Sequence, residues 1–321
     1  MKLIVTIDTE EDNWGSYNPT SYSVNNIKRI SELQMLFEEH EVIPTYLITY
    51  SVATDPFAIS IFKGIVQREG CEIGAHCHPW NTPPFIEHPD KRNSMLCNLP
   101  AELQFRKLST LHQTISDNFK MVPTSFRAGR WGYGKEVALS LKQLGYKVDS
   151  SILSFYDWTD IHGPNCSMIS PEPYWFNPDR IYQPSSEGEM LEVPGVVAYA
   201  QSNFRRCNDV FNFFKTTPLR YLRIIGMLDK LNMLNRIWLS PEQSTADQMI
   251  TLIRRLISER IPVANLYFHS PTLEPGLTPY VKSESDRRIF LDRIRAVMQF
   301  ARENQIESIR LSDAVNVVST C

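Results

Sequence analysis

Strand-like and helix-like segments alternate along most of this sequence, and that alternation limits the folds open to it. Short runs of β-branched and apolar residues predict buried strands at residues 2–7, 44–50, 71–76, 146–152 and 263–269, and another that ends near Arg130. The spacing of apolar residues predicts helices at residues 24–40, 55–69, 102–119, 135–144 and 286–304, and another that begins at Ser244. Strands that alternate with helices over short connections are typical of parallel βα units.

About seven such repeats, with a final strand at residues 308–311 to close the ring, predict an irregular (β/α)7-type barrel of the α/β class. An open parallel sheet is the alternative that the pattern leaves. We expect residues 1–321 to form a single barrel domain with an α+β insertion at about residues 153–243. In that stretch Pro, Tyr and Trp accumulate, a short strand-like run spans residues 190–193, and an apolar helix-like stretch spans residues 219–238.

Charge, apolar stretches and cysteine spacing limit the binding surfaces, the cellular location and the thiol chemistry that we expect. Lys plus Arg total 33 and Asp plus Glu total 36, and neither sign forms a long block, so no nucleic-acid or anionic-membrane surface is expected. The N-terminus lacks the apolar core of a signal peptide, and no stretch approaches the roughly 20 apolar residues of a transmembrane helix, so we expect a cytoplasmic protein. The six cysteines form no CxxC pair and predict free thiols: Cys71, Cys77, Cys97, Cys166, Cys207 and Cys321.

Polar residues gather where the predicted strands end. They are Asp8, Glu10, His76, His78, Arg127, Arg130, Asp149 and His269. In βα barrels the carboxyl ends of the strands form the rim on which active sites are built. Each residue taken alone also has a structural interpretation: a turn or solvated acidic loop for the acids, hydrogen-bonded structural histidines, and ordinary ion pairs for the arginines.

The spacing of these residues suggests a metal site. Asp8 and Glu10 are two apart, as are His76 and His78, so each pair faces one side of an extended backbone. Two imidazoles and one carboxylate can hold a dication and leave a position for water, which favours hydrolysis. A late His269 on the same rim could protonate a leaving amine. An arginine beside Asp8 would keep that carboxylate ionised.

Five short motifs occur in the order found in the polysaccharide deacetylases of the NodB-homology type, carbohydrate esterase family 4, and the sequence resembles that family. They are TIDTE at residues 6–10, EIGAHCH at 72–78, FRAG at 126–129, DSS at 149–151 and LYFH at 266–269. The resemblance covers about residues 1–152 and 244–311. Within it, the stretches GAHCHPWNTPP and HSPTLEPGLTPY are similar to a subgroup linked to bacterial cell-surface polysaccharide synthesis.

The resemblance implies a hydrolase that removes an acetyl group from an amino sugar or glycan precursor, with a divalent metal, most often Zn²⁺, as cofactor. It implies Asp8 as general base, His269 as general acid, Arg127 as the tether of Asp8, and Asp149 as the acid of the fourth motif. It places the metal on an acid just after Asp8 and on the histidine motif, hence Glu10, His76 and His78. Four residues are candidates for contact with the sugar, although aromatic residues like the three among them are more often core residues: Trp80, Arg130, Trp131 and Tyr133.

The sequence departs from the family in two places. The family has its metal acid directly after the base, where this chain has Thr9, so Glu10 must serve, with Glu11 or Asp12 as further candidates. The family's two histidines lie four apart, but Trp80 stands four residues after His76. A small-molecule amidohydrolase and an inactive glycan-binding barrel therefore stay open as alternatives. The insertion is expected to shape specificity, and its apolar part at residues 221–239 could bury a homodimer contact or touch a lipid carrier.

Overall fold

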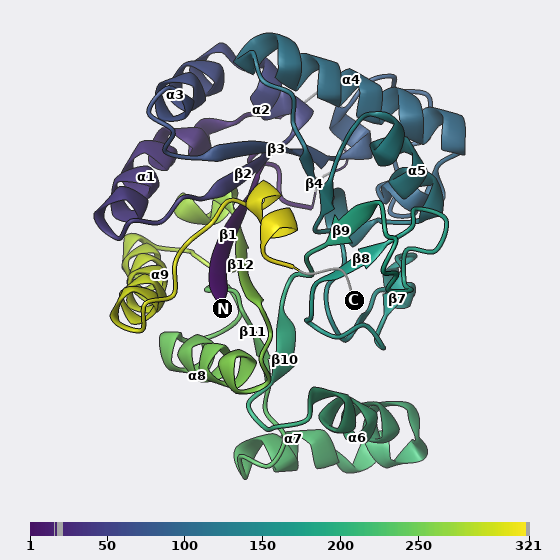
Figure 1. The fold of residues 1–321 in the computed structure, drawn as a ribbon, viewed down its shortest axis with the longest axis vertical. Coiled ribbons are helices and arrows are strands. Elements are labelled where there is room, and N and C mark those ends of the chain that lie inside the picture. Colours follow the sequence, from purple (N-terminus) through teal and green to yellow (C-terminus); the bar gives the residue numbers. More distant parts are fainter. Residues whose placement is uncertain (16, 18–21, 319–321) are drawn as a thin grey trace.

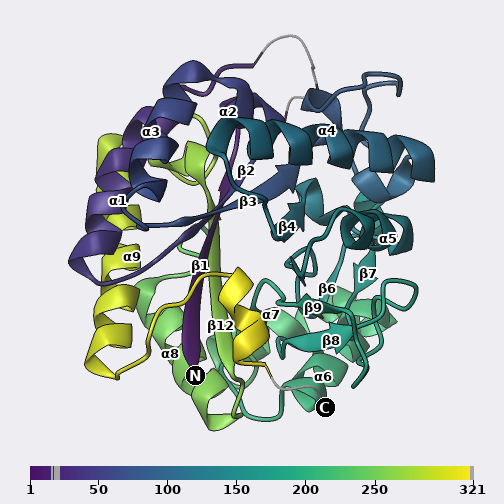
Figure 2. The ribbon, with the colours of Figure 1, turned by 45° about the horizontal axis from the view of Figure 1, so that its top comes forward.

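A computed structural model describes residues 1–15, 17 and 22–318. Figures 1 and 2 show a curled sheet with helices around its outer side. The strands are β1 (Lys2–Thr9), β2 (Thr45–Ile48), β3 (Glu72–Cys77), β4 (Ser125–Ala128), β5 (Val148–Asp149), β6 (Tyr156–Asp157), β7 (Asn165–Cys166), β8 (Tyr174–Phe176), β9 (Met190–Glu192), β10 (Val197–Tyr199), β11 (Arg236–Trp238) and β12 (Val263–His269). The α-helices are α1 (Ile30–Glu39), α2 (Tyr50–Thr54), α3 (Pro56–Val66), α4 (Ala101–Phe119), α5 (Lys135–Gln143), α6 (Phe204–Thr216), α7 (Ile224–Lys230), α8 (Ala246–Ser258) and α9 (Glu284–Glu303).

The main sheet has the order β12-β1-β2-β3-β4-β5-β9-β8. All its neighbouring strands are parallel except β8, which pairs antiparallel with β9. Between β12 and β9 the ring is bridged by an irregular segment, because Tyr267 N–H donates to the Leu239 carbonyl at 3.1 Å and Leu239 N–H donates to the Val196 carbonyl at 2.9 Å. The predicted α/β class and irregular barrel are confirmed.

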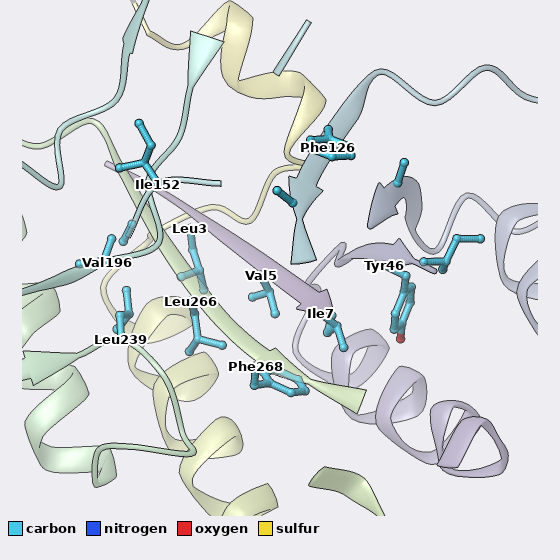
Figure 3. Packing of buried hydrophobic residues seen from close by; sticks show 14 of the residues in the cluster. Leu3, Val5, Ile7, Tyr46, Phe126, Ile152, Val196, Leu239, Leu266 and Phe268 are labelled. Atoms are coloured by element: carbon cyan, nitrogen blue, oxygen red, sulfur yellow. The ribbon is translucent and has the colours of Figure 1, made fainter. Parts of the chain in front are cut away.

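Alternation along β1 separates two kinds of environment. Leu3, Val5 and Ile7 point outward and pack with Leu266 and Phe268 of β12 in the core beneath the helices, as Figure 3 shows. The residues between them point inside the barrel. Their contacts change along the strand from apolar to charged, since Ile4 packs in a small inner core, Thr6 takes part in a hydrogen-bond network, and Asp8 forms an ion pair. Along β1 the charged side chain therefore lies at the carboxyl end of the barrel.

The expected last strand at residues 308–311 is wrong. Ser308 forms only an isolated bridge to Leu3, and the chain then turns across the amino-terminal end of the barrel. There Ile309, Leu311 and Ala314 pack against Ile4 and other inner side chains. This C-terminal segment closes the amino-terminal end of the barrel with apolar side chains. Those apolar residues explain why the sequence pattern predicted a short strand there.

The expected insertion at residues 153–243 contributes more to the barrel than the sequence suggested, because β9 lies within it and pairs parallel with β5. The helix-like stretch at residues 219–238 is only partly helical: α7 ends at Lys230, and residues 236–238 form β11, which pairs with β10. Asn232, with a φ of 55°, marks the reversal between them. No helix in the described part of the chain is long and apolar enough to cross a bilayer.

Two helices begin with capping boxes, and the described cysteines are free thiols. Helix α8 is capped by Thr245, whose side chain and that of Gln248 form a capping box, so the helix begins just after the predicted start at Ser244. Helix α9 begins with the same arrangement between Ser283 and Asp286. The described cysteines, Cys71, Cys77, Cys97, Cys166 and Cys207, are all free thiols as predicted. Cys321 lies outside the described residues.

Candidate metal centre and active site

Three of the predicted residues form a compact group of possible metal ligands. Glu10, His76 and His78 are buried, and one ligand atom of each lies within 4.8 Å of the others. The Glu10 Oε2 atom is 3.5 Å from His76 Nε2 and 3.2 Å from His78 Nε2, and the two Nε2 atoms are 3.0 Å apart. Ligand atoms about 2.0–2.1 Å from a tetrahedral ion lie about 3.3 Å from one another, so these side chains already have the separations that a zinc-like ion requires.

The other nitrogen of each imidazole is held by a hydrogen bond that aims Nε2 at the group. His76 Nδ1 lies 3.0 Å from the Arg127 carbonyl, and His78 Nδ1 lies 2.8 Å from Glu11 Oε1. A carbonyl or carboxylate partner requires Nδ1 to carry the hydrogen, so Nε2 is the atom of each ring that can bind an ion once it is unprotonated. Both rings are therefore oriented as ligands before any ion arrives.

Glu11 is a positioning residue for His78 rather than part of the ligand group. Besides His78, its buried carboxylate accepts hydrogen bonds from Trp80 Nε1 at 2.9 Å, Asn81 Nδ2 at 2.7 Å and Ser51 Oγ at 3.1 Å. Asp12, the other further candidate, accepts from Ser23 and from the backbone of residues 25–26, so it stabilises a loop. Glu10 is thus the acid in the ligand group.

The position where the family would have its second histidine has another use. Trp80 stacks on the His78 ring with centroids 4.1 Å apart and an interplanar angle of 26°. Gly129 also approaches the ring, so closely that an added Cβ would lie 2.3 Å from a carbon of the His78 ring. His78 is therefore packed against an indole and against a residue without a side chain.

Asp8 lies next to the ligand group and is held by Arg127. Arg127 Nη1 donates to Asp8 Oδ1 at 2.6 Å, and Nη2 donates to Thr6 Oγ1 at 2.8 Å. The second oxygen, Oδ2, lies 4.0 Å from His76 Nε2 and 3.7 Å from His269 Nε2. Burial raises the pKa of Asp8, but the Arg127 guanidinium and the neighbouring histidines outweigh it, so the pKa lies below its usual value.

A neighbouring charged side chain also shifts the pKa of His269, but it raises this pKa. Its Nδ1 lies 2.9 Å from Glu242 Oε2, and Glu242 Oε1 accepts from the His269 backbone N–H at 3.1 Å and from the Thr272 hydroxyl. Burial lowers the pKa of His269, but the Glu242 carboxylate outweighs this effect and raises the pKa to about 9. At neutral pH Asp8 is thus ionised while His269 is protonated.

A cavity of about 510 Å³ opens onto this group. It is lined by Asp8, Glu10, His76, His78 and His269, and by many aromatic side chains, among them Trp14, Tyr17, Trp80, Trp131, Trp238 and Tyr280. Arg130 also lines it, and its Nη1 donates to Ser94 Oγ at 3.0 Å. Residues 130 and 131 both have positive φ values, 54° and 60°, so the backbone turns sharply where it presents these two side chains.

Three predicted site residues do not line this cavity, and of these only Arg127 is bonded to the group around Asp8. Asp149 is buried beside Glu192 and accepts from the Ser151 hydroxyl at 2.7 Å, because its strand, β5, pairs with β9 at that point. Tyr133 is buried in the outer core with the side chains under the helices. The structure does not bring either residue to the group around Asp8, and we assign neither of them a contact with substrate.

Sequence reasoning missed Glu242 and the positioning role of Glu11. Glu242 lies between β11 and α8, in a stretch assigned to the insertion, and no spacing relates it to His269. Glu11 was considered only as a substitute ligand. A weak signal existed for it, since a carboxylate next to a pair of spaced histidines often serves as their hydrogen-bond partner.

Comparisons with known proteins support the fold. The structure is similar to that of the putative glycoside hydrolase/deacetylase from Parabacteroides distasonis, with a TM-score of 0.59 and 11% identity over 98% of this chain and 71% of that one. It is also similar to 4-alpha-glucanotransferase from Thermococcus litoralis, with a TM-score of 0.52 and 11% identity over 99% of this chain and 40% of that one. A putative polysaccharide deacetylase from Mycobacterium smegmatis matches with a TM-score of 0.49 and 15% identity over 100% of this chain and 92% of that one. No family model and no curated protein matches the sequence. The predicted resemblance is confirmed at the level of the fold.

Proposed function

We propose that this chain is a metal-dependent deacetylase of the carbohydrate esterase family 4 type, which hydrolyses an acetyl amide or ester on a sugar or glycan precursor. The observation that carries the proposal is the set of ligand separations between Glu10, His76 and His78, beside an ionised Asp8 and a protonated His269. The fold shared with a glycoside hydrolase/deacetylase supports the substrate class. The aromatic lining of the cavity supports it too, since indole and phenol rings stack on the apolar faces of sugars.

In the proposed reaction two side chains handle protons. Asp8 Oδ2 takes a proton from the attacking water, and Arg127 keeps that carboxylate ionised and fixed in orientation. His269 Nε2 gives a proton to the leaving amine or alcohol, and Glu242 keeps the ring charged. When bound, a dication supplies Lewis-acid polarisation of the acyl carbonyl and makes water more acidic. Glu10, His76 and His78 would hold it.

We propose Zn²⁺ as the ion, because two imidazoles and one carboxylate in a small buried group suit a borderline cation better than Mg²⁺ or Ca²⁺, which prefer six or more oxygen ligands. We further propose a cytoplasmic enzyme that acts on precursors of a cell-surface polysaccharide. The free described cysteines fit a reducing compartment.

The test is acetate release from an N-acetylated oligosaccharide, measured together with the metal content of the purified protein. We expect one ion per chain, loss of release on chelation, recovery with Zn²⁺, and loss of both metal and activity in His76→Ala. His88→Ala is the matched control, because the His88 side chain is 81% exposed and outside the cavity lining. Acetate release that survives chelation and His76→Ala would refute the proposal. A protein without stoichiometric metal or acetate release would favour the inactive glycan-binding alternative.

A further inference from the structure

The α6–α7 unit, residues 204–233, stands apart from the barrel in Figure 1 and carries an unusual surface. It consists of α6, a 3-10 helix at Pro218–Leu222 and α7, which contact one another, and α6 also contacts β10. Seven of the nineteen exposed large hydrophobic side chains in the described part of the chain fall within these 30 residues: Val210, Phe213, Tyr221, Leu222, Met227, Leu231 and Met233. Exposed apolar side chains concentrated in this way mark an interaction surface.

The exposed apolar side chains of α6 lie on the face that turns away from the barrel. Phe204, Cys207 and Asn208 are buried at helical spacing, whereas Val210 is 38% and Phe213 is 54% exposed. Apolar side chains are also exposed in the unit beyond α6, where Leu222 and Met227 are both more than half exposed. The unit is thus anchored by one face of α6 and offers apolar groups elsewhere.

Basic residues are interspersed with these apolar residues along the unit. Residues 204–233 contain six basic residues, Arg205, Arg206, Lys215, Arg220, Arg223 and Lys230, and only two acidic ones, Asp209 and Asp229, although the whole chain has a formal net charge of −3. The basic residues are spaced along the sequence and form no run there. Arg205, Arg206, Lys215, Arg223 and Lys230 are exposed, and no ion pair of theirs occurs among the residues that the structure describes.

We propose that the α6–α7 unit docks on an anionic membrane surface, its apolar side chains entering the interface and its basic side chains binding lipid phosphates. This combination of groups is that of helices that lie in the plane of a membrane surface. A second copy of the chain is disfavoured as the occupant, because a symmetric contact would bring two strongly basic patches together. We expected no anionic-membrane surface from the sequence, and the proposed docking departs from that expectation.

The docking unit is connected directly to the wall of the cavity. The Arg236 guanidinium lies 4.8 Å from the ring centroid of Phe211 in α6 and 5.2 Å from that of Tyr156, which lines the cavity. Docking would therefore hold the cavity near the interface and suit a saccharide carried on a lipid. That consequence rests on the proposed function, whereas docking itself does not.

The experiment is co-sedimentation of the full chain with vesicles of phosphatidylcholine, with and without phosphatidylglycerol. We expect binding only to the anionic vesicles, and weakening at high salt. Replacing Phe213 and Met227 together by Ser, or Arg205 and Arg206 together by Gln, is expected to weaken binding about tenfold or more. The matched control replaces Met35 and Val122 by Ser, since both are about as exposed and lie outside residues 204–233.

Equal binding of the wild-type chain and the Phe213/Met227 variant, or no sedimentation with anionic vesicles, would overturn the proposal. So would a dimer in light scattering that becomes monomeric in that variant, because the patch would then belong to a second copy. Circular dichroism of each variant establishes that it is folded. Vesicle binding does not depend on acetate release, so a failed deacetylase test and a failed docking test are distinguishable.

Discussion

Two groups of buried carboxylates lie at the carboxyl ends of strands in the same sheet, and their pKa values are shifted in opposite directions. The first consists of Asp8, Glu10 and Glu11 at the end of β1, and the pKa values of all three are lowered. The second consists of Asp149 in β5 and Glu192 in β9, which are cross-strand partners. Burial raises the pKa of Asp149 to about 6, and burial together with the Asp149 carboxylate raises that of Glu192 well above its usual value.

The neighbours of each group explain the difference. Burial acts on all five acids in the same direction, but the first group has Arg127, His76, His78 and His269 around it. In the second group the two acids mainly face each other and hydroxyl or backbone donors, and neither forms an ion pair in the described part of the chain. Ionised carboxylates can bind a cation or accept a proton, whereas an acid that keeps its proton carries no charge with which to hold a cation. We therefore place the chemistry at the first group.

The largest expected effect is that of Asp8→Asn. The amide keeps the size of the side chain but cannot take a proton, so we expect the rate of acetate release to fall by about 10²–10⁴. The metal content should persist, because Asp8 is not one of the three ligand candidates. Glu192→Gln, the matched change in the second group, should alter the rate by less than about threefold. Similar losses in both variants would show that the two groups do not differ in function.

Glu11→Gln separates ligand positioning from ligand binding within the first group. The amide nitrogen would replace one carboxylate oxygen and face either His78 and Trp80 or Asn81 and Ser51, so the set of hydrogen bonds that orients the His78 ring would be broken. We expect the affinity for Zn²⁺ to fall about 10–100-fold, as measured by competition with a chelator. Trp80→Phe keeps an aromatic ring on His78 but removes one donor to Glu11, and a smaller loss is expected. Unchanged affinity in Glu11→Gln would make Glu11 merely structural.

Glu242→Gln tests how far a carboxylate outside the first group controls the acid. The pKa of His269 is about 9, so the protonated and active form is present at neutral pH and is lost as the pH rises through that value. Without the Glu242 charge the pKa should move down toward 6.5, the ordinary value for histidine. We expect the alkaline limb of the kcat/KM profile to move to lower pH, with a loss of a few fold at pH 7. An unmoved limb would assign it to another group.

The first group could be predicted because it depends on the alternation of side chains along a strand, which is the rule of shortest range in a sheet. Asp8 and Glu10, and likewise His76 and His78, are each two residues apart at the end of an apolar strand, and neighbouring parallel strands bring their ends together. His269 followed for the same reason, since it is the register partner of Asp8 on β12. Strand existence and alternation thus sufficed for this part of the site.

The second group and the partners of the site could not be predicted, because they depend on pairings across long stretches of chain. Asp149 reads as a rim residue like the others, and only the placement of β9 beside β5, more than forty residues later, turns it toward Glu192. Glu242 reaches His269 from a loop with no periodicity to analyse. Trp80 and Gly129 contact the His78 ring from the ends of two different strands. The spacing along the chain, which departs from that of the family, therefore gave no indication of these contacts.

The smallest effect, and the most direct test of the second group, is the stability of Glu192→Gln. Because the folded-state pKa values of Asp149 and Glu192 are raised, their stability contribution is fully present below about pH 4, where both carboxyls are protonated even in the unfolded chain. It is lost as the pH rises toward and beyond 6, since the unfolded chain ionises first and the folded chain must then hold the protons.

Glutamine at position 192 removes one of these acids. The free energy of unfolding of the variant should therefore exceed that of the wild-type chain by an amount that grows from pH 5 to pH 8. We expect this difference to reach about 1–3 kcal/mol at pH 8, a rise in Tm of a few degrees, measured by thermal unfolding across that range. Glu39→Gln on the exposed surface of α1 is the control for a general effect of charge. A variant destabilised equally at both pH values would mean that Glu192 is ionised and paired in the folded protein, and the contrast between the two groups would then have to be abandoned.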